Sequence, residues 1–307
     1  MTRRSFLSQV PAWLSVPLLL PTPSQAQTMP QPMVGRVERL SNFPSKFVDA
    51  RHVDVWLPPD YDATRRYQAL YMHDGQMLFD ARTTWNKKAW HADAVAAGLI
   101  SLGLVHDFII VGPWSNGQFR HSEYFPAKFL PHLPEPLRQG LVKQGLLGRS
   151  QSDAYLRFLV EELKPAIDAR YATRTEREAT FVMGSSMGGL ISAYALCEHT
   201  SIFGGAACMS THWIGTFERN DEVPRAAMAY LRGALPEPSS VKLWMDRGTA
   251  ELDAQYDPAQ SWIDTLMTEK GFVRGARYQS QVYEGAGHSE VDWAKRLRDP
   301  LVFLLGR

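Results

Sequence analysis

The sequence predicts one large domain of the α/β class, in which a mostly parallel central sheet is flanked by helices. Short apolar runs that are typical of strands alternate along the chain with longer amphipathic stretches that are typical of helices. Strands joined through helices pair in parallel by right-handed crossovers. The chain has 307 residues, of which 45% are hydrophobic, and this is enough for one sizeable core.

The first residues are expected to be a leader rather than part of the fold. Paired arginines in Thr2 to Leu7 precede a weakly apolar segment over residues 10–20 and the small-x-small pattern Ser24-Gln-Ala26. This order resembles a bacterial twin-arginine (Tat) signal peptide more than a Sec signal, and a disordered basic N-terminus is the alternative. We predict a Tat signal over residues 1–26, a linker over 27–34 and the catalytic domain over 35–307. The Tat machinery would export the folded protein to the periplasm or the medium.

Periodicity gives the order of the elements. Strands are expected at residues 35–40, 52–57, 67–72, 108–111, 181–183, 203–209, 241–245 and 278–283. Helices are expected at residues 90–102, 153–170, 190–197, 225–235, 259–270 and 293–305. In the second strand, Asp54 and Trp56 alternate with aliphatic residues, which indicates one exposed face. The fourth strand is apolar throughout, as expected when helices cover both faces.

Residues 113–149 form an insertion with poor periodicity. Four prolines interrupt it, and large apolar residues occur between them. A long apolar insertion of this kind is either a lid or binding loop, or an excursion packed on the domain surface. The pattern is compatible with both.

One stretch carries the clearest indication of chemistry. Gly184-Ser-Ser-Met-Gly188 matches the pattern G-x-S-x-G, with Ser186 at its centre. An apolar strand precedes the motif and a helix follows it, which is the context of a nucleophile elbow. Gly184 and Gly188 have no Cβ, so the strand and the helix can approach closely while the serine points out of the sheet. Ser186 is therefore the predicted nucleophile.

A serine nucleophile needs a base and an acid, which on this scaffold follow it in the order serine, acid, histidine. His288 is the predicted base, because it comes directly after the last strand in a glycine-rich loop. The acid is expected after the preceding strand, where Asp246, Glu251 and Asp253 all qualify. Asp246 stands at the strand end and could instead brace the loop. Spacing alone does not separate Glu251 from Asp253.

Further residues are expected around the nucleophile. The backbone N–H groups of Met187 and of Gln76, in the loop after the third strand, are the predicted oxyanion hole. Asp74, Trp114 and Trp213 are predicted substrate contacts, with Trp213 expected to be exposed. Tryptophans can stack on sugar or aromatic acyl groups, although most of them in a protein of this kind belong to the core.

Six sequence blocks together resemble a known family. The blocks are His73-Asp-Gly-Gln-Met-Leu-Phe-Asp80, Trp85 with Trp90-His91, Arg120-His-Ser-Glu-Tyr-Phe-Pro126, Gly184-Ser-Ser-Met-Gly-Gly189, Asp246-Arg-Gly-Thr249, and Gly287-His-Ser-Glu290 with Trp293. In this order they resemble the "putative esterase" family of the α/β-hydrolase superfamily, which includes esterase D, enterochelin esterase and feruloyl esterase relatives. The resemblance covers most of the chain after the leader.

The resemblance implies an α/β-hydrolase fold with a lid-like insertion, and ester hydrolysis without a cofactor. It matches Ser186 to the nucleophile and His288 to the base. The wider family matches the acid to Glu251, whereas the nearer relatives, with the form Gly-Thr-x-x-Leu-Asp, match it to Asp253. We choose Asp253 and keep Glu251 as the alternative.

The substrate is expected to be a small-molecule or saccharide ester, because the family acts on siderophores, acylated sugars and thioesters. A ferric siderophore is a large anion and would need converging cations. The insertion offers basic residues that are equally compatible with solvated charge, namely Arg120, Lys128, Arg138, Lys143 and Arg149.

Composition excludes other classes of partner. The net charge of +1 and the lack of a long basic run argue against nucleic acid. No apolar run is long enough for a membrane span. Cys197 and Cys208 are expected to be small core residues, with a disulfide as the alternative. No Cys/His spacing suggests a metal site.

The leading hypothesis is an exported carboxylic-ester hydrolase. Acyl transfer to an alcohol is the alternative within the enzyme class. A non-catalytic binding module on a hydrolase scaffold is the alternative outside it, and the presence of both Ser186 and His288 argues against that module.

Overall fold

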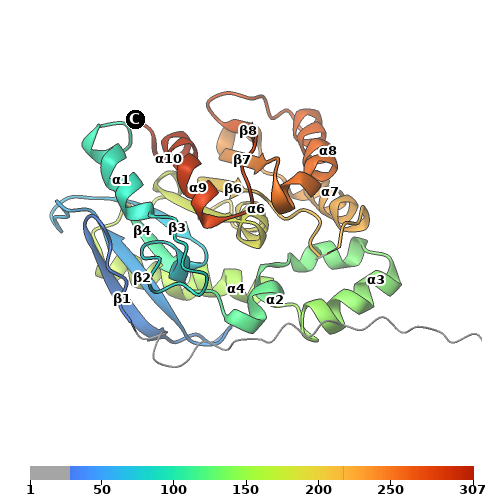
Figure 1. Cartoon of the computed structure of the whole chain (residues 1–307), viewed down its shortest axis with the longest axis horizontal. Helices are drawn as coiled ribbons and strands as arrows, with labels where there is room; N and C mark the ends of the chain where they lie inside the picture. Colours follow the sequence, from blue (N-terminus) through green and yellow to red (C-terminus); the bar gives the residue numbers. More distant parts are fainter. Residues whose placement is uncertain (1–27, 217) are drawn as a thin grey trace, which may run out of the picture.

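A computed structural model of the chain describes residues 28–216 and 218–307, which form an eight-stranded sheet with helices on both faces (Figure 1). The predicted signal peptide over residues 1–26 lies outside the described residues. The strand order is β1-β2-β4-β3-β5-β6-β7-β8. β2 is antiparallel to both β1 and β4, and all other neighbours are parallel. The predicted α/β fold with a mostly parallel sheet is confirmed.

The eight predicted strands are found within a few residues of their expected bounds. They are β1 (Arg36–Phe43), β2 (Arg51–Leu57), β3 (Gln68–Met72), β4 (Phe108–Pro113), β5 (Thr180–Ser185), β6 (Gly205–Met209), β7 (Lys242–Gly248) and β8 (Tyr278–Tyr283). The α-helices are α1 (Ala92–Ser101), α2 (Arg120–Tyr124), α3 (Glu135–Gly140), α4 (Ser152–Arg157), α5 (Lys164–Arg170), α6 (Met187–Glu198), α7 (Glu222–Ala234), α8 (Asp257–Glu269), α9 (Glu290–Arg296) and α10 (Arg298–Leu305).

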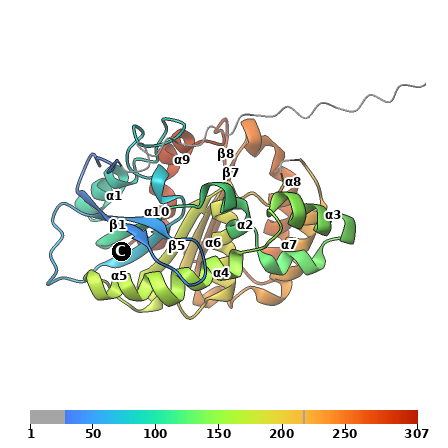
Figure 2. The same ribbon diagram turned by 90° about the horizontal axis from the view of Figure 1, so that it is seen from below.

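Two cores form on the two faces of the sheet, because successive side chains of a strand point in opposite directions. On β3, Ala69 and Tyr71 join the larger core, which α4 to α8 cover. Leu70 and Met72 join the smaller core beneath α1, α9 and α10. Figures 1 and 2 show α1 and α10 together on one side, away from α4 and α5. Helices on both faces explain why the central strands are apolar throughout.

The prediction of an exposed face on β2 is wrong. Asp54 and Trp56 are both buried. The indole N–H of Trp56 donates to the Val34 carbonyl at 2.8 Å, and the Asp54 carboxylate pairs with Arg39 of β1 at 2.6 Å. Trp56 packs into the core beneath α1 and against the segment before β1, and the Arg39 side chain covers Asp54. Strand periodicity alone does not reveal such a cover.

Two predicted helices are interrupted. The helix expected at residues 153–170 consists of α4, a π-helical segment (Phe158–Leu163) and α5. The helix expected at residues 293–305 begins earlier and divides into α9 and α10, which meet at Leu297. Pro300 has no N–H to donate and is tolerated in the first turn of α10, so the chain starts a new helix here.

The insertion over residues 113–149 packs against the domain. It contains α2, a 3₁₀ segment (Ala127–His132), α3 and a π-helical turn (Leu141–Gly145), seen in green in Figure 1. Phe125 and Phe129 are buried in the larger core, where the 3₁₀ segment contacts α7. Ser115 and Arg120, near its start, line the cavity described below. The insertion is thus a packed part of the domain that also supplies a cavity wall.

The two cysteines are free thiols. Cys208 is buried in β6, and Cys197 is half-buried in α6. Burial raises the pKa of Cys197 to about 12, so this thiol is protonated at neutral pH. Both behave as the small core residues expected from the sequence.

Candidate active site

Ser186 stands in the sharp turn between β5 and α6. Its backbone has φ 58° and ψ −123°, a conformation that residues other than glycine rarely adopt. Close contact between two glycines permits the turn, because a Cβ on Gly184 would lie 2.7 Å from the carbonyl carbon of Gly188. The Ser186 N–H donates to the Met209 carbonyl at 2.9 Å, which ties the turn to β6. This geometry presents the serine side chain to a cavity at the carboxyl edge of the sheet.

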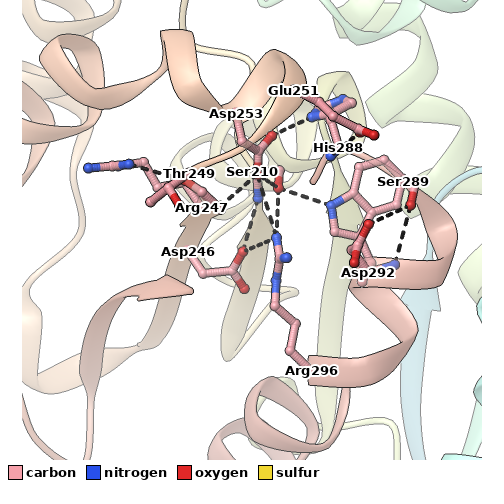
Figure 3. Close-up of polar contacts among 12 residues, drawn as sticks. Ser210, Asp246, Arg247, Thr249, Glu251, Asp253, His288, Ser289, Asp292 and Arg296 are labelled. Atoms are coloured by element: carbon pink, nitrogen blue, oxygen red, sulfur yellow. Dashed lines mark hydrogen bonds and ion pairs between the residues drawn. The ribbon is translucent and has the colours of Figure 1, made fainter. Parts of the chain in front are cut away.

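His288 follows β8 and lies against Asp253 (Figure 3). The distance from His288 Nδ1 to Asp253 Oδ1 is 2.5 Å. Because an ionised carboxylate only accepts hydrogen bonds, Nδ1 carries the proton and Nε2 keeps a lone pair. The ring of Trp293 packs edge-on against the imidazole, with the centroids 4.9 Å apart. The imidazole is thus held in one orientation and one tautomer.

Of the three candidate acids, Asp253 is the one that contacts the imidazole. It is fully buried. Glu251 is exposed, and its Oε2 accepts the backbone N–H of His288 at 2.9 Å, so it braces the loop that carries the histidine. Asp246 is buried at the end of β7, 3.0 Å from the Arg296 guanidinium (Figure 3). Burial raises the pKa of Asp246, and the guanidinium opposes that rise.

The loop after β3 comes close to β4 at a pair of glycines. A Cβ on Gly75 would lie 2.0 Å from the Gly112 carbonyl oxygen, so only glycine fits there. The Gln76 side chain then bridges to the insertion: its Nε2 donates to Ser115 Oγ at 2.6 Å, and the Ser115 N–H donates to its Oε1 at 3.1 Å. These contacts fix the Gln76 backbone at the cavity. Met187 is the first residue of α6, where N–H groups have no acceptor within the helix.

Asp74 lines the cavity, but its carboxylate is engaged. Arg120 Nε and Nη2 each lie 2.7 Å from one of its oxygens. Burial acts to raise the pKa of Asp74, but the guanidinium outweighs this effect and lowers the pKa. Asp74 therefore orders Arg120 at the cavity wall instead of offering a free carboxylate to a substrate.

The cavity has a volume of about 570 Å³, and both Ser186 and His288 line it. Its apolar wall is mainly aromatic and includes Trp85, Trp90 and Trp293. Trp85 is 78% exposed, which is unusual for so large an apolar side chain. The cavity can therefore accept a planar or ring-shaped group beside the serine.

The structure places two of the predicted substrate contacts outside the cavity lining. Trp213 was expected to be exposed but is fully buried, and its indole N–H donates to Gln260 at 2.9 Å. Trp114 lies outside the cavity lining: its indole N–H donates to Asp54 at 2.9 Å, and Arg39 stacks over its ring. Both indoles take part in packing and hydrogen bonding within the domain, Trp213 fully buried and Trp114 half-buried.

Sequence reasoning missed two residues beside the nucleophile, His212 and Tyr256. Burial lowers the pKa of His212 to about 3, so its ring is neutral. His212 Nε2 is 3.0 Å from the Thr216 carbonyl and must donate to it, which makes Nδ1 the acceptor for the Tyr256 hydroxyl at 2.6 Å. Burial raises the pKa of Tyr256, and the Ser186 side chain, which lies near that hydroxyl, acts to lower it. No motif marks either residue, because they come from loops that meet only in the folded chain.

The sequence profile of a family described as "Putative esterase" matches residues 45–304. The chain belongs to this family. As a member of it, the protein is a carboxylic ester hydrolase, and the predicted family and class of enzyme are confirmed.

The esterase is similar to several proteins at low identity. "Uncharacterized protein YbbA" of Bacillus subtilis (strain 168) is 20% identical over 264 residues, which are 84% of this chain and 93% of that protein. A solved ferulic acid esterase superposes with a TM-score of 0.63 at 21% identity, covering 88% of this chain and 98% of its own. An IroE-like serine hydrolase from Shewanella oneidensis superposes with a TM-score of 0.64 at 18% identity, covering 88% and 80%. At these identities the two solved structures establish a shared fold.

Two negative findings concern the described part of the esterase. Over residues 28–216 and 218–307, no group of three or more His, Cys, Asp or Glu side chains is arranged to hold a metal ion. Within the same ranges, no helix has the length and apolar character needed to cross a membrane.

Two buried neutral histidines are expected to make the stability of the esterase depend on pH. Burial lowers the pKa of His73 to about 4 and that of His212 to about 3, from 6.5. Unfolding restores the ordinary pKa, so below pH 6.5 the unfolded chain binds protons that the folded chain does not. The free energy of unfolding therefore falls as the pH falls through 6.5, by roughly 2 kcal/mol per histidine at pH 5.

Denaturant unfolding at pH 7.5 and pH 5 measures this effect. The unfolding midpoint should drop at the lower pH, and His73→Gln should reduce the size of the drop. His132 is exposed, so His132→Gln serves as the control and should leave the drop unchanged. Equal stability of the wild-type protein at the two pH values would contradict the assignment of both histidines as neutral.

Proposed function

We propose that the protein is an exported serine esterase with the triad Ser186, His288 and Asp253 and an acyl-enzyme intermediate. The observation that carries this proposal is the 2.5 Å contact between His288 Nδ1 and the buried Asp253, beside a cavity that the strained Ser186 also lines. The twin-arginine leader over residues 1–26 supports export to the periplasm or the medium. Mass spectrometry of the exported protein tests this last point, with Gln27 expected as its first residue.

The reaction proceeds in two halves. Ser186 Oγ attacks the ester carbonyl carbon while its proton passes to His288 Nε2, and Asp253 stabilises the imidazolium. The backbone N–H groups of Met187 and Gln76 donate to the oxyanion. The C–O bond to the alcohol then breaks as His288 returns the proton to the leaving oxygen. Water, deprotonated by His288, attacks the acyl-enzyme in the same way, which frees the acid and restores Ser186.

The Ser186 hydroxyl changes partner on the way to attack. In this structure the Ser186 side chain lies near Tyr256, whose own proton is committed to His212. Any hydrogen bond between the two hydroxyls is therefore donated by Ser186. When an ester occupies the cavity, rotation about the Cα–Cβ bond of Ser186 turns the hydroxyl toward His288 Nε2, and catalytic hydrogen bonds of this kind are often completed only in the substrate complex.

The substrate class that the cavity supports best is an ester with an aromatic acyl group or a sugar alcohol. Its aromatic wall suits planar rings. A ferric siderophore is less compatible, because the cavity lining carries no excess of positive charge. Its two cations, Lys88 and Arg120, are matched by two carboxylates, Asp74 and Glu290, and Asp74 pairs directly with Arg120. Lys128 instead pairs with Glu198 on the surface.

Trp85 is expected to act as a stacking platform for the larger part of the substrate. Trp85→Ala should raise KM for a feruloylated saccharide by about 3–10-fold, because a stacked aromatic contact contributes about 0.5–1.5 kcal/mol. p-Nitrophenyl acetate is too small to reach from Ser186 to the exposed Trp85. Its KM in Trp85→Ala should therefore stay within about twofold of the wild-type value.

A panel of p-nitrophenyl esters, methyl ferulate, a feruloylated saccharide and a ferric siderophore ester measures both the substrate class and the effect of Trp85. Trp262 on α8 lies outside the cavity lining, so Trp262→Ala is the matched control. Faster hydrolysis of the siderophore ester than of methyl ferulate would overturn the assigned substrate class. Equal KM values for the feruloylated saccharide in wild type and Trp85→Ala would show that Trp85 does not contribute to binding this substrate.

A further inference from the structure

We propose that Ser210 is a positioning residue for the triad acid Asp253. Its hydroxyl donates a hydrogen bond to Asp253 and to no other group, and so orients the carboxylate. This inference rests on the proposed triad and adds a residue that acts through it. Ser210 directly follows β6, is fully buried and has φ 41°, a value that few non-glycine residues adopt. Its N–H donates to Asp246 Oδ1 at 3.1 Å, which anchors its backbone to the end of β7 (Figure 3).

The direction of the Ser210 proton follows from its partners. Trp293 Nε1 lies 2.9 Å from Ser210 Oγ, and Arg296 Nη2 lies 2.7 Å from it. An indole N–H and a guanidinium N–H can only donate, so together they occupy both lone pairs of the hydroxyl. The hydroxyl proton then has one acceptor left, Asp253 Oδ2 at 2.5 Å. The Ser210 hydroxyl cannot accept a further hydrogen bond. In the hydrogen bond between Ser210 and Asp253, Ser210 is therefore always the donor.

The two carboxylate oxygens of Asp253 have different partners. Oδ2 accepts from Ser210 and from the Gly248 N–H at 2.6 Å, whereas Oδ1 faces His288 Nδ1. A carboxylate held by two donors at one oxygen cannot rotate away from the imidazole. Ser210 thus sets both the orientation of the acid and the share of negative charge that Oδ1 presents to His288.

The buried Arg296 supports a functional reading of the cluster. Its guanidinium pairs with Asp246 and lies 3.8 Å from Asp253 Oδ2. Among the described residues, its Nε and Nη1 atoms have no hydrogen-bond partner. The guanidinium also lies over the Tyr283 ring, 5.1 Å from its centroid, so Arg296 is fixed in place where it donates to Ser210.

Several titratable groups face Asp253 and His288 and share control of their charge. They are Arg296 of α9, Asp246 of β7, Glu251 in the 3₁₀ segment Glu251–Gln255, Tyr256 directly after that segment, and His212 in the loop after β6. Changing Ser210 leaves all of them in place. Because removing the hydroxyl also takes an acceptor from Arg296 and Trp293, Ser210→Cys, which keeps a donor and acceptor at this position, is needed beside Ser210→Ala to assign a change in pH profile to the Ser210–Asp253 bond.

The test compares Ser210→Ala with the wild-type full chain. Loss of the hydroxyl should lower kcat by about 10–100-fold with little change in KM, because orientation of the acid matters in the transition state and not in substrate binding. The acidic limb of the kcat profile should move to higher pH, since the less-solvated carboxylate favours the protonated imidazole. Ser210→Cys keeps a weaker donor and should fall between the two.

Controls separate this inference from a structural effect and from the proposed triad. Ser280 is a buried serine on β8 that donates to Asp264, so Ser280→Ala should leave kcat and the pH profile unchanged. If Ser210→Ala does not fold, Ser210→Cys carries the test alone. A wild-type kcat and pH profile in the folded Ser210 variant would overturn the proposal. If Ser186→Ala and Asp253→Asn still abolish activity, the triad stands and Ser210 alone is rejected.

Discussion

Ser186→Ala is expected to lower kcat for an activated ester by about 10⁴–10⁶-fold, because no other group then supplies the nucleophile to the acyl-enzyme. The same variant should lose all covalent labelling by a fluorophosphonate, which reacts with activated serines. Substrate binding should change little, since alanine leaves the cavity walls as they are. Ser186 and the neighbouring Ser185 both line the cavity, so the modified residue must be identified by peptide mapping.

A folded Ser186→Ala protein is required for this result to count. Alanine and serine tolerate a φ of 58° about equally. The variant should therefore retain the strained turn and unfold with a wild-type melting curve. Ser280→Ala, which changes a buried serine away from the cavity, should label at the wild-type rate. Labelling of Ser186→Ala, or hydrolysis within about tenfold of wild type, would refute the proposed nucleophile.

Asp253→Asn should cost far more activity than Glu251→Gln. Asparagine can turn its N–H toward His288 Nδ1 and favour the wrong imidazole tautomer, so kcat should drop by about 10⁴-fold. Glutamine at position 251 keeps an oxygen that can accept the backbone N–H of His288, and the loss should stay below about tenfold. Initial rates on p-nitrophenyl acetate at saturating concentration measure both variants.

The pair of variants also decides between the two acids that the sequence motif left open. A larger loss in Glu251→Gln than in Asp253→Asn would move the acid role to Glu251. Because Asp253 is buried and accepts from both Gly248 and Ser210, its variant must be checked for folding by its melting temperature. Slow fluorophosphonate labelling of Ser186 in a folded Asp253→Asn protein would show that the serine remains accessible while the base is misdirected.

The fold was predictable because its determinants are local. Short apolar runs separated by amphipathic stretches indicated strands joined by crossover helices, and the sheet is mostly parallel, with β4 placed between β2 and β3. The glycines at positions 184 and 188 indicated the sharp turn at Ser186, because a tight strand–helix approach excludes a Cβ. Predictions failed where a distant segment changes the surroundings of a residue. Trp56 is buried because it packs into the core beneath α1 and its indole N–H donates to Val34.

The candidate site was predictable only in part. The order of Ser186 and His288 along the chain gave two of its residues, since the carboxyl ends of parallel strands meet at one edge of the sheet. Tyr256, His212 and Ser210 carry no motif, and nothing in their spacing points to the nucleophile or the acid. The prediction that Trp213 is exposed failed because the residues next to a loop tryptophan in the sequence do not determine whether its side chain packs inward or outward.

The sequence by itself determined the class of fold, the family and the turn that holds Ser186, because periodicity, block order and glycine spacing act within short segments. Only the tertiary structure decided which carboxylate meets His288. Asp253 and Glu251 are two residues apart in one segment and 35 or more residues from the histidine, yet one reaches its ring and the other its backbone. That choice depends on how the loops after β6, β7 and β8 pack together, with Ser210 and Gly248 holding one carboxylate in the interior while Glu251 stays in solvent.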